Sequence, residues 1–138
     1  MDTRGQHLLA EYHGCRTSLL NDKDIIQRLL TRAAEDAGAT VVAAVFHRFS
    51  PQGISGVVVI EESHLSIHTW PEAGYAAVDF YTCGDCHPEL AHRRLMEGLQ
   101  PERAELLTVV RGMGWERSIR VSDHQFDGAW MPQASNEG

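Results

Sequence analysis

The chain has 138 residues, and its 12 Lys and Arg against 19 Asp and Glu give a net charge of −7. One domain is expected, because domains commonly run to roughly 100–200 residues and half of this chain could not bury a core alone. The acidic balance argues against nucleic-acid binding, which depends on Lys and Arg contacts to phosphates. A cationic small molecule is a compatible partner.

The cysteines and the N-terminus indicate where the protein works. Cys15, Cys83 and Cys86 are an odd number without the regular spacing of a disulfide framework. Residues Met1–Gly5 carry no apolar stretch typical of a signal peptide, and no run approaches the ~20 apolar residues of a membrane span. We therefore expect a cytoplasmic protein that does not act at a membrane.

The first half of the chain predicts a strand, a helix and a second strand. Leu8–Tyr12 is a short strand, and Thr40–Phe49 is rich in the β-branched and aromatic residues of another. Between them Asn21 is the expected N-cap and Gly38 the expected stop of a helix. The apolar residues of this helix recur at helical spacing, namely Ile25, Ile26, Leu29, Leu30, Ala33, Ala34 and Ala37.

The second half predicts more strands, joined by short turns. Turns are expected at 50–53 and 71–74, where proline and glycine favour chain reversal. The expected elements are strands at 54–61, 64–70, 76–82 and 104–111 and a helix at 89–99. Short loops favour antiparallel pairing, and both helices should cover one face. The fold class is therefore α+β, a two-layer α/β sandwich with a mainly antiparallel sheet.

The tail after Gly112 has a weaker pattern than the rest of the chain. Trp115, Phe126 and Trp130 are apolar anchors among polar neighbours. We expect residues 113–138 to dock against the same domain as its C-terminal tail.

Glu62-Ser63-His64 is the most informative motif, because it lies between two apolar runs, 57–60 and 65–70. A serine at the junction of two strands, preceded by a glutamate and followed by histidines, suits a hydroxyl that attacks its own backbone. Taken alone, the same motif would favour an ordinary hairpin serine with a hydrogen-bonded sheet histidine at His68.

A longer block decides between these readings. Residues 62–72, Ala76–Asp79 and Thr82–Gly84 together resemble the bacterial and archaeal S-adenosylmethionine decarboxylases, and the looser resemblance runs from Gly5 to Gly112. Those enzymes process themselves and carry a covalent pyruvoyl group. The resemblance implies a decarboxylase domain at 1–112 that acts on S-adenosylmethionine and supplies the aminopropyl donor for spermidine. It also implies a homodimer with sites built across the interface.

The resemblance implies that the cofactor is made from Ser63. Its hydroxyl attacks the carbonyl of Glu62, the peptide bond becomes an ester, and elimination followed by hydrolysis leaves pyruvoyl on a chain 63–138, separate from a chain 1–62. The resemblance assigns stabilisation of the cyclic intermediate to Ser55 and the proton transfers to His68. Histidine suits proton transfer because its pKa lies near working pH.

Strand geometry puts a condition on this chemistry. Side chains alternate between faces along a strand, so Ser63 and His68 would point to opposite sides of a regular strand. We therefore expect Ser63 in the turn, ahead of a strand that starts near His64. The even positions His64, Ser66, His68 and Trp70 should share one face, and Leu65, Ile67 and Thr69 should lie under the helices.

Decarboxylation adds further expected residues. A pyruvoyl carbonyl forms a Schiff base with the substrate amine, and the resemblance gives Cys83 the role of proton donor to the product; most free cysteines, by contrast, are small buried hydrophobes. Phe49 and Trp70 would stack on adenine, unless they are ordinary core residues. Glu72 would make a polar contact to the ligand, and Glu11 would face the site more weakly.

Two alternatives stay open on the sequence. Cys83 to His87 reads Cys-x-x-Cys-His, a pattern of metal or haem sites, although no second such pair exists and we expect no metal. The family usually has Tyr where Ala73 stands, so the pocket could instead suit a basic amino acid. A pyruvoyl-dependent arginine or ornithine decarboxylase is therefore the alternative function.

Overall fold

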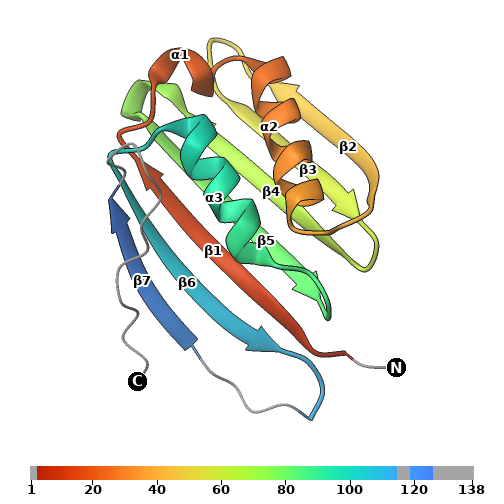
Figure 1. Cartoon of the computed structure of the whole chain (residues 1–138). Helices are drawn as coiled ribbons and strands as arrows, with labels where there is room; N and C mark the ends of the chain where they lie inside the picture. The colour runs from red at the N-terminus through yellow and green to blue at the C-terminus, as the bar shows by residue number, and fades with distance from the viewer. Residues whose placement is uncertain (1–2, 115–118, 126–138) are drawn as a thin grey trace.

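A seven-stranded sheet with every neighbouring pair antiparallel forms one layer of the molecule (Figure 1). The computed structural model describes residues 3–114 and 119–125. The strands are β1 Gly5–His13, β2 Val41–Arg48, β3 Ile54–Ile60, β4 Ser63–Trp70, β5 Tyr75–Cys83, β6 Arg103–Arg111 and β7 Ile119–Gln125. Their order across the sheet is β2-β3-β4-β5-β1-β6-β7.

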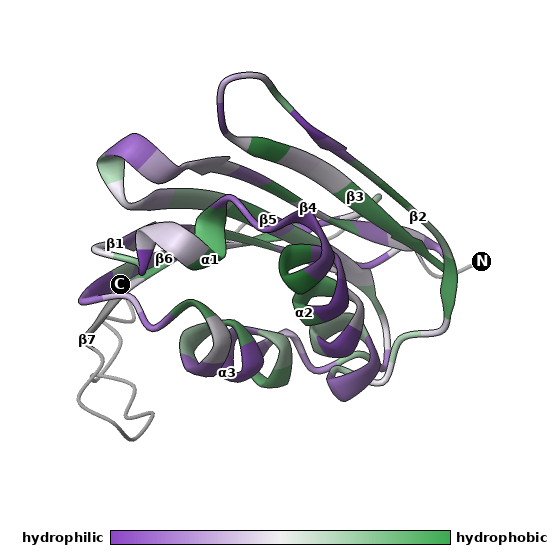
Figure 2. Cartoon of the chain, turned by 90° about the horizontal axis from the view of Figure 1, so that it is seen from above, coloured by the Kyte–Doolittle hydropathy of each residue, from purple (hydrophilic) through white to green (hydrophobic). Residues whose placement is uncertain are grey.

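The second layer consists of helices that all lie on one face of the sheet (Figure 2). They are α1 Thr17–Leu20, α2 Lys23–Asp36 and α3 Pro88–Leu99, and a short 3-10 turn, η1, covers Pro71–Ala73. The predicted α+β sandwich is confirmed, with α1 as a short helix that the sequence pattern did not indicate. In the described residues no helix has the length and apolar character needed to span a membrane.

The start of α2 differs from the prediction by one residue. Asp22 is the N-cap and its side chain accepts a hydrogen bond from the backbone N–H of Ile25 at 3.1 Å. Asn21 instead accepts from the backbone N–H of Gly53, so it ties the helix start to the turn before β3. The predicted stop is confirmed, because Gly38 has a φ of 89° and leaves the helix in a conformation that costs glycine little.

Alternation along the strands divides the sheet into an apolar face and a polar face. Leu65 and Ile67 are fully buried beneath the helices, as predicted for the odd positions of β4. Thr69 is also buried there, and its hydroxyl donates to the carbonyl of Leu20 while accepting from the N–H of Ile54. The other side of the sheet, here called the open face, carries most of the polar side chains that are candidates for the functional site.

β7 was missed by the sequence pattern. Ile119–Gln125 is a largely polar segment that pairs with β6 at the edge of the sheet, where one side of a strand has no partner. Part of the predicted tail therefore extends the sheet. Trp115, Phe126 and Trp130 lie outside the described residues.

The order of the strands in the sheet interleaves the two halves of the chain. β1, β2 and β3 precede position 62, whereas β4 to β7 follow it. β1 nevertheless lies between β5 and β6, and β3 lies beside β4. The sheet thus joins residues before and after position 62 through pairings that do not depend on the peptide bond between them.

Candidate functional site

The turn between β3 and β4 holds Glu62 in an unusual backbone conformation. Ile60 pairs with Ser63, so only Glu61 and Glu62 form the turn, and Glu62 has a φ of 67°. A side-chain-bearing residue in the left-handed region costs roughly 1–2 kcal/mol. Ser63 is the first residue of β4, whereas the sequence placed it in the turn. The peptide bond between Glu62 and Ser63 is therefore at the junction of a strained residue and a regular strand.

The Ser63 hydroxyl is buried and has no hydrogen-bond partner among the described residues. Buried polar side-chain atoms almost always find a partner, and leaving one unsatisfied costs about 1–3 kcal/mol. Such an orphaned hydroxyl has no competing acceptor or donor that would hold it away from the neighbouring carbonyl. This is the observation that makes Ser63 fit the precursor of a pyruvoyl group.

Cys83, at the end of β5, lies beside the same peptide bond. Its thiol sulfur is 3.4 Å from the carbonyl oxygen of Glu62, within the reach of a weak S–H to O hydrogen bond. The side chain is half-buried and its sulfur forms no disulfide. The structure thus brings Glu62, Ser63 and Cys83 together, as the sequence analysis required.

Ser55 and His68 form a pair at the other end of the same hairpin. They lie directly opposite one another on β3 and β4, and the Ser55 hydroxyl is 2.8 Å from Nδ1 of His68. His68 is five residues farther along β4 than Ser63. At about 3.3 Å per residue, the two positions are roughly 16 Å apart along the strand. Within one chain, therefore, Ser63 does not meet the pair that was expected to process it.

Exposed aromatic side chains surround that Ser55–His68 pair. Phe49 is 47% and Trp70 44% exposed, which excludes the reading that both are core residues. Trp70 stacks on Tyr75 with ring centroids 5.2 Å apart, and Phe49 contacts His47 edge to face at 4.6 Å. In a single chain, the flat apolar faces of these rings are exposed to solvent.

Two acidic residues accompany these aromatic rings. Glu11 accepts a hydrogen bond from the Tyr75 hydroxyl, and burial raises the pKa of its carboxyl, partly offset by nearby His13. Glu72 lies in η1 directly after Trp70 and Pro71 and is exposed. Phe49, Trp70, Glu72 and Glu11 thus belong to the His68 end of the open face, away from Ser63. Tyr75 is a member of this group that the sequence analysis did not identify.

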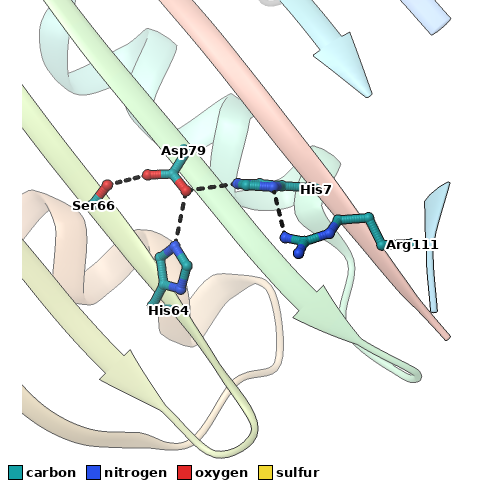
Figure 3. Close-up of polar contacts among 5 residues, drawn as sticks. All are labelled: His7, His64, Ser66, Asp79 and Arg111. Carbon is teal, nitrogen blue, oxygen red and sulfur yellow. Dashed lines mark hydrogen bonds and ion pairs between the residues drawn. The ribbon is translucent and has the colours of Figure 1, made fainter. Parts of the chain in front are cut away.

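A third group, the Asp79 cluster, consists of His7, His64, Ser66, Asp79 and Arg111 on the open face, and His64 directly follows Ser63 in β4 (Figure 3). Asp79 Oδ2 is 2.7 Å from Nε2 of His7 and 2.9 Å from Nε2 of His64. The Ser66 hydroxyl donates to the other oxygen of Asp79, and the guanidinium of Arg111 donates to Nδ1 of His7 at 3.2 Å. Sequence reasoning missed this cluster because its members come from four strands, although all occupy open-face positions.

The Asp79 carboxyl has a lowered pKa. Partial burial acts to raise the pKa, but the hydrogen bonds from Ser66, His7 and His64 stabilise the ionised form and outweigh it. Asp79 therefore stays ionised to lower pH than an ordinary aspartate, and it can accept hydrogen bonds on both oxygens.

Within residues 3–114 and 119–125, the Asp79 cluster is also where three residues of metal-ligating types converge, namely His7, His64 and Asp79. The arrangement of hydrogen bonds speaks against a metal there. A guanidinium only donates, so Nδ1 of His7 must accept and Nε2 must carry the proton that Asp79 receives. The Cys83–His87 motif gathers no such set in the described part of the chain.

Comparison with known proteins identifies the family. A family model described as S-adenosylmethionine decarboxylase matches residues 6–112. The chain is 46% identical over 124 residues to the S-adenosylmethionine decarboxylase proenzyme of Acetivibrio thermocellus, covering 89% of this chain and 99% of that one. It is 60% identical over 122 residues to the proenzyme of the same name from Clostridium kluyveri, covering 88% and 96%.

Solved structures agree with this assignment. The adenosylmethionine decarboxylase of Aquifex aeolicus aligns with a TM-score of 0.72 and 36% identity over 86% of this chain and 98% of that chain. An AdoMetDC monomer from Trypanosoma brucei, at 16% identity and a TM-score of 0.59, shares the fold over 75% of this chain and 45% of that chain. The chain belongs to the S-adenosylmethionine decarboxylase family, whose proenzymes carry a pyruvoyl group formed from a serine.

The lowered pKa of Asp79 predicts how stability depends on pH. The folded pKa is below the unfolded value of about 3.9, so the carboxylate stabilises the fold above that value and loses this contribution as pH falls through the folded pKa. Asp79→Asn should lower the free energy of unfolding by about 1–2 kcal/mol at pH 5, discounted for partial exposure. The difference in free energy of unfolding between Asp79→Asn and the parent chain should become smaller below about pH 4.

Urea unfolding, followed by circular dichroism, checks this on chains that also carry Ser63→Ala, so that the hydroxyl of the expected cleavage site is absent. Asp36→Asn is the matched control, because Asp36 bonds Arg94 on the exposed side of α2 and should change stability by less than about 0.5 kcal/mol. If the difference in free energy of unfolding between Asp79→Asn and its parent grew as the pH was lowered, the lowered pKa of Asp79 would be contradicted.

Proposed function

We propose that the chain cleaves itself between Glu62 and Ser63 and that the resulting 63–138 chain decarboxylates S-adenosylmethionine, which supplies the aminopropyl donor for spermidine synthesis. The observation that carries this proposal is the buried, unpartnered hydroxyl of Ser63 next to Glu62 in its left-handed conformation. The family assignment supports the activity, because the relatives named above are decarboxylase proenzymes.

The local geometry supports the proposed cleavage step. The Ser63 hydroxyl has no other partner, and attack on the preceding carbonyl relieves the conformation that Glu62 holds in the turn. The Cys83 thiol already contacts the oxygen on which negative charge develops during that attack. Ser55 and His68 are proposed to complete the site, Ser55 by stabilising the cyclic intermediate and His68 by moving protons.

A homodimer would bring those residues to Ser63. Ser55 and His68 lie roughly 16 Å from Ser63 along the hairpin, so a two-fold pairing of open faces would place the pair of one chain over the serine of the other. The open face carries exposed apolar side chains that such a pairing would cover, at Val45, Phe49, Val59 and Trp70. We propose two equivalent sites, each built from both chains.

The proposed pyruvoyl group supplies an electrophilic carbonyl that draws electrons from the bond to the leaving carboxylate. Cys83 is the proposed proton donor to the product carbon. An ordinary thiol, with a pKa near 8.5, is mostly protonated at neutral pH. Cys83 must remain reduced for this role, which a cytoplasmic location would ensure.

The exposed aromatic pair favours S-adenosylmethionine as the substrate. Phe49 and Trp70 offer two apolar faces to an adenine and to a sulfonium, whose positive charge is attracted to aromatic rings. Glu72 and Glu11 are the proposed polar contacts. Free arginine or ornithine has no aromatic base to place on these rings, so the basic amino acids remain the alternative to be tested.

The proposal predicts two fragments and one preferred substrate. Mass spectrometry of the purified protein should show a chain ending at Glu62 and a chain from position 63 that carries a hydrazine-reactive ketone. Ser63→Ala should stay intact. Release of labelled CO₂ should be fast with S-adenosylmethionine and near background with arginine and ornithine. An intact wild-type chain after long incubation would refute self-processing, and a preference for arginine or ornithine would refute the substrate assignment alone.

The assignment of Cys83 predicts a separation between cleavage and turnover. Cys83→Ala should still cleave, although more slowly through loss of the thiol contact to the Glu62 carbonyl, because Ser63 and the proposed Ser55–His68 pair remain, while kcat of the cleaved protein should fall by about 100-fold or more through loss of the proton donor. Cys86→Ala is the matched control, since it removes a second thiol from the same loop and should turn over normally. Side-by-side gel analysis and steady-state kinetics measure both, and a Cys83→Ala chain with unchanged kcat would remove the role.

The shared site predicts complementation between two inactive chains. His68→Ala and Ser63→Ala should each remain uncleaved when expressed alone. When they are co-expressed in equal amounts, the mixed dimer pairs Ser63 of the His68→Ala chain with His68 of the other chain. About half of the His68→Ala chains should then be cleaved, for random pairing in a two-fold dimer. No cleavage in the mixture, with mixed dimers verified by differential tagging, would contradict a site built across two chains.

A further inference from the structure

We propose that Asp79 is a positioning residue that holds the group at position 63 in place after cleavage, acting through the side chain of His64. This inference rests on the proposed self-cleavage. It gives a role to the Asp79 cluster, which takes no part in the cleavage and decarboxylation steps described above.

Cleavage creates a positioning problem at residue 63. Before cleavage the peptide bond to Glu62 fixes this residue on one side, and afterwards it is the free end of a strand. Its remaining backbone neighbour across the hairpin is Ile60, which then belongs to the other fragment. Strand ends fray unless something ties them down. The nearest side chain that can do so on the same fragment is that of His64, the next residue.

His64 is held by a carboxylate from the adjacent strand. Its Nε2 is 2.9 Å from Asp79 Oδ2, and its backbone lies opposite Tyr81 of β5. The chain end is therefore tied to β5 by both backbone pairing and a side-chain hydrogen bond. β5 and the new chain end belong to the same fragment, so this tie does not depend on the broken bond.

Asp79 is itself fixed by donors from two other positions. His7 of β1 donates to the same oxygen that His64 uses, at 2.7 Å, and Ser66 donates to the second oxygen. The bond from His7 crosses between fragments 1–62 and 63–138, and Arg111 holds the His7 ring from its other side. A carboxylate with three donors has a single favoured orientation, and it transmits that orientation to His64.

The cluster also determines the tautomer of His64. An ionised carboxylate only accepts, so Nε2 of His64 must carry a proton. The His64 ring contacts the Tyr81 ring edge to face, with ring centroids 6.2 Å apart, and the Arg111 guanidinium lies over the Tyr81 ring at 4.4 Å from its centroid. Loss of the Asp79 carboxylate would free the ring to change tautomer and to rotate, which gives a spectroscopic signature separate from enzyme activity.

The kinetic test compares Asp79→Asn with Asp36→Asn and wild type in the cleaved, full-length protein. We expect kcat, normalised to phenylhydrazine-titrated ketone, to fall about tenfold or more in Asp79→Asn, because small misplacements of a reacting group are costly. KM should stay within about twofold, since the proposed substrate contacts lie elsewhere. His64→Leu should show the same loss in kcat, and the double variant should be no worse than either single one.

Nitrogen-15 NMR of histidine-labelled protein is the second measurement. His64 should be locked as the Nε2-protonated form in wild type and Asp36→Asn, and should sample both tautomers in Asp79→Asn. A normal kcat per ketone in both Asp79→Asn and His64→Leu, or an unchanged His64 tautomer in Asp79→Asn, would overturn the positioning role even if these variants were less stable. A wild-type protein that neither cleaves nor decarboxylates would instead refute the proposed function.

Discussion

The pairing of Ile60 with Ser63 is the constraint on which the site depends. This pairing leaves two residues for the turn, and Glu62 accepts a left-handed conformation that glycine would adopt with less strain. The same pairing starts β4 at Ser63, so alternation turns its hydroxyl toward the buried side, where no described group bonds it. The hydrophobic pattern of β4 enforces this register, because a slip by one residue would expose Leu65 and Ile67. Core packing thus maintains the reactive geometry.

The same alternation is consistent with the proposal that each site is built from two chains. Ser63 shares the buried side of β4 with Leu65 and Ile67, whereas His68 lies on the open face, and the hairpin also separates the two residues along its length. Asp79 and Cys83 gather at the Ser63 end, while Trp70 and its aromatic neighbours gather at the other. The two ends of the open face thus carry different groups of side chains. In the proposed two-fold dimer, the symmetry axis would bring the Ser63 end of one chain to the His68 end of the other.

Local signals in the sequence predicted the parts of this structure that depend on local physics. The apolar stripe gave α2, the turn residues gave the hairpins, and the alternation of β4 gave its buried side. The cap was misplaced because Asn21 and Asp22 are both good caps, and only the distant turn at Gly53 decides which one is free. The Asp79 cluster could not be predicted, since it requires the register between β1 and β5, in which His7 and Asp79 are 72 positions apart in the sequence. β7 has too few apolar residues to signal a strand and is defined by its partner, β6.

The interleaved sheet also bears on the order of folding and of the proposed cleavage. β1 pairs with β5 and β6, and β3 pairs with β4, so each of these pairings joins a strand before position 62 to a strand after it. Neither fragment could bury its own strands alone, and the strained turn at Glu62 exists only once Ile60 has paired with Ser63. The geometry on which the proposed cleavage depends is therefore a product of the completed sheet. The same strand pairings, together with the bond from His7 to Asp79, do not depend on the peptide bond between Glu62 and Ser63, so they would keep the two proposed fragments joined after cleavage.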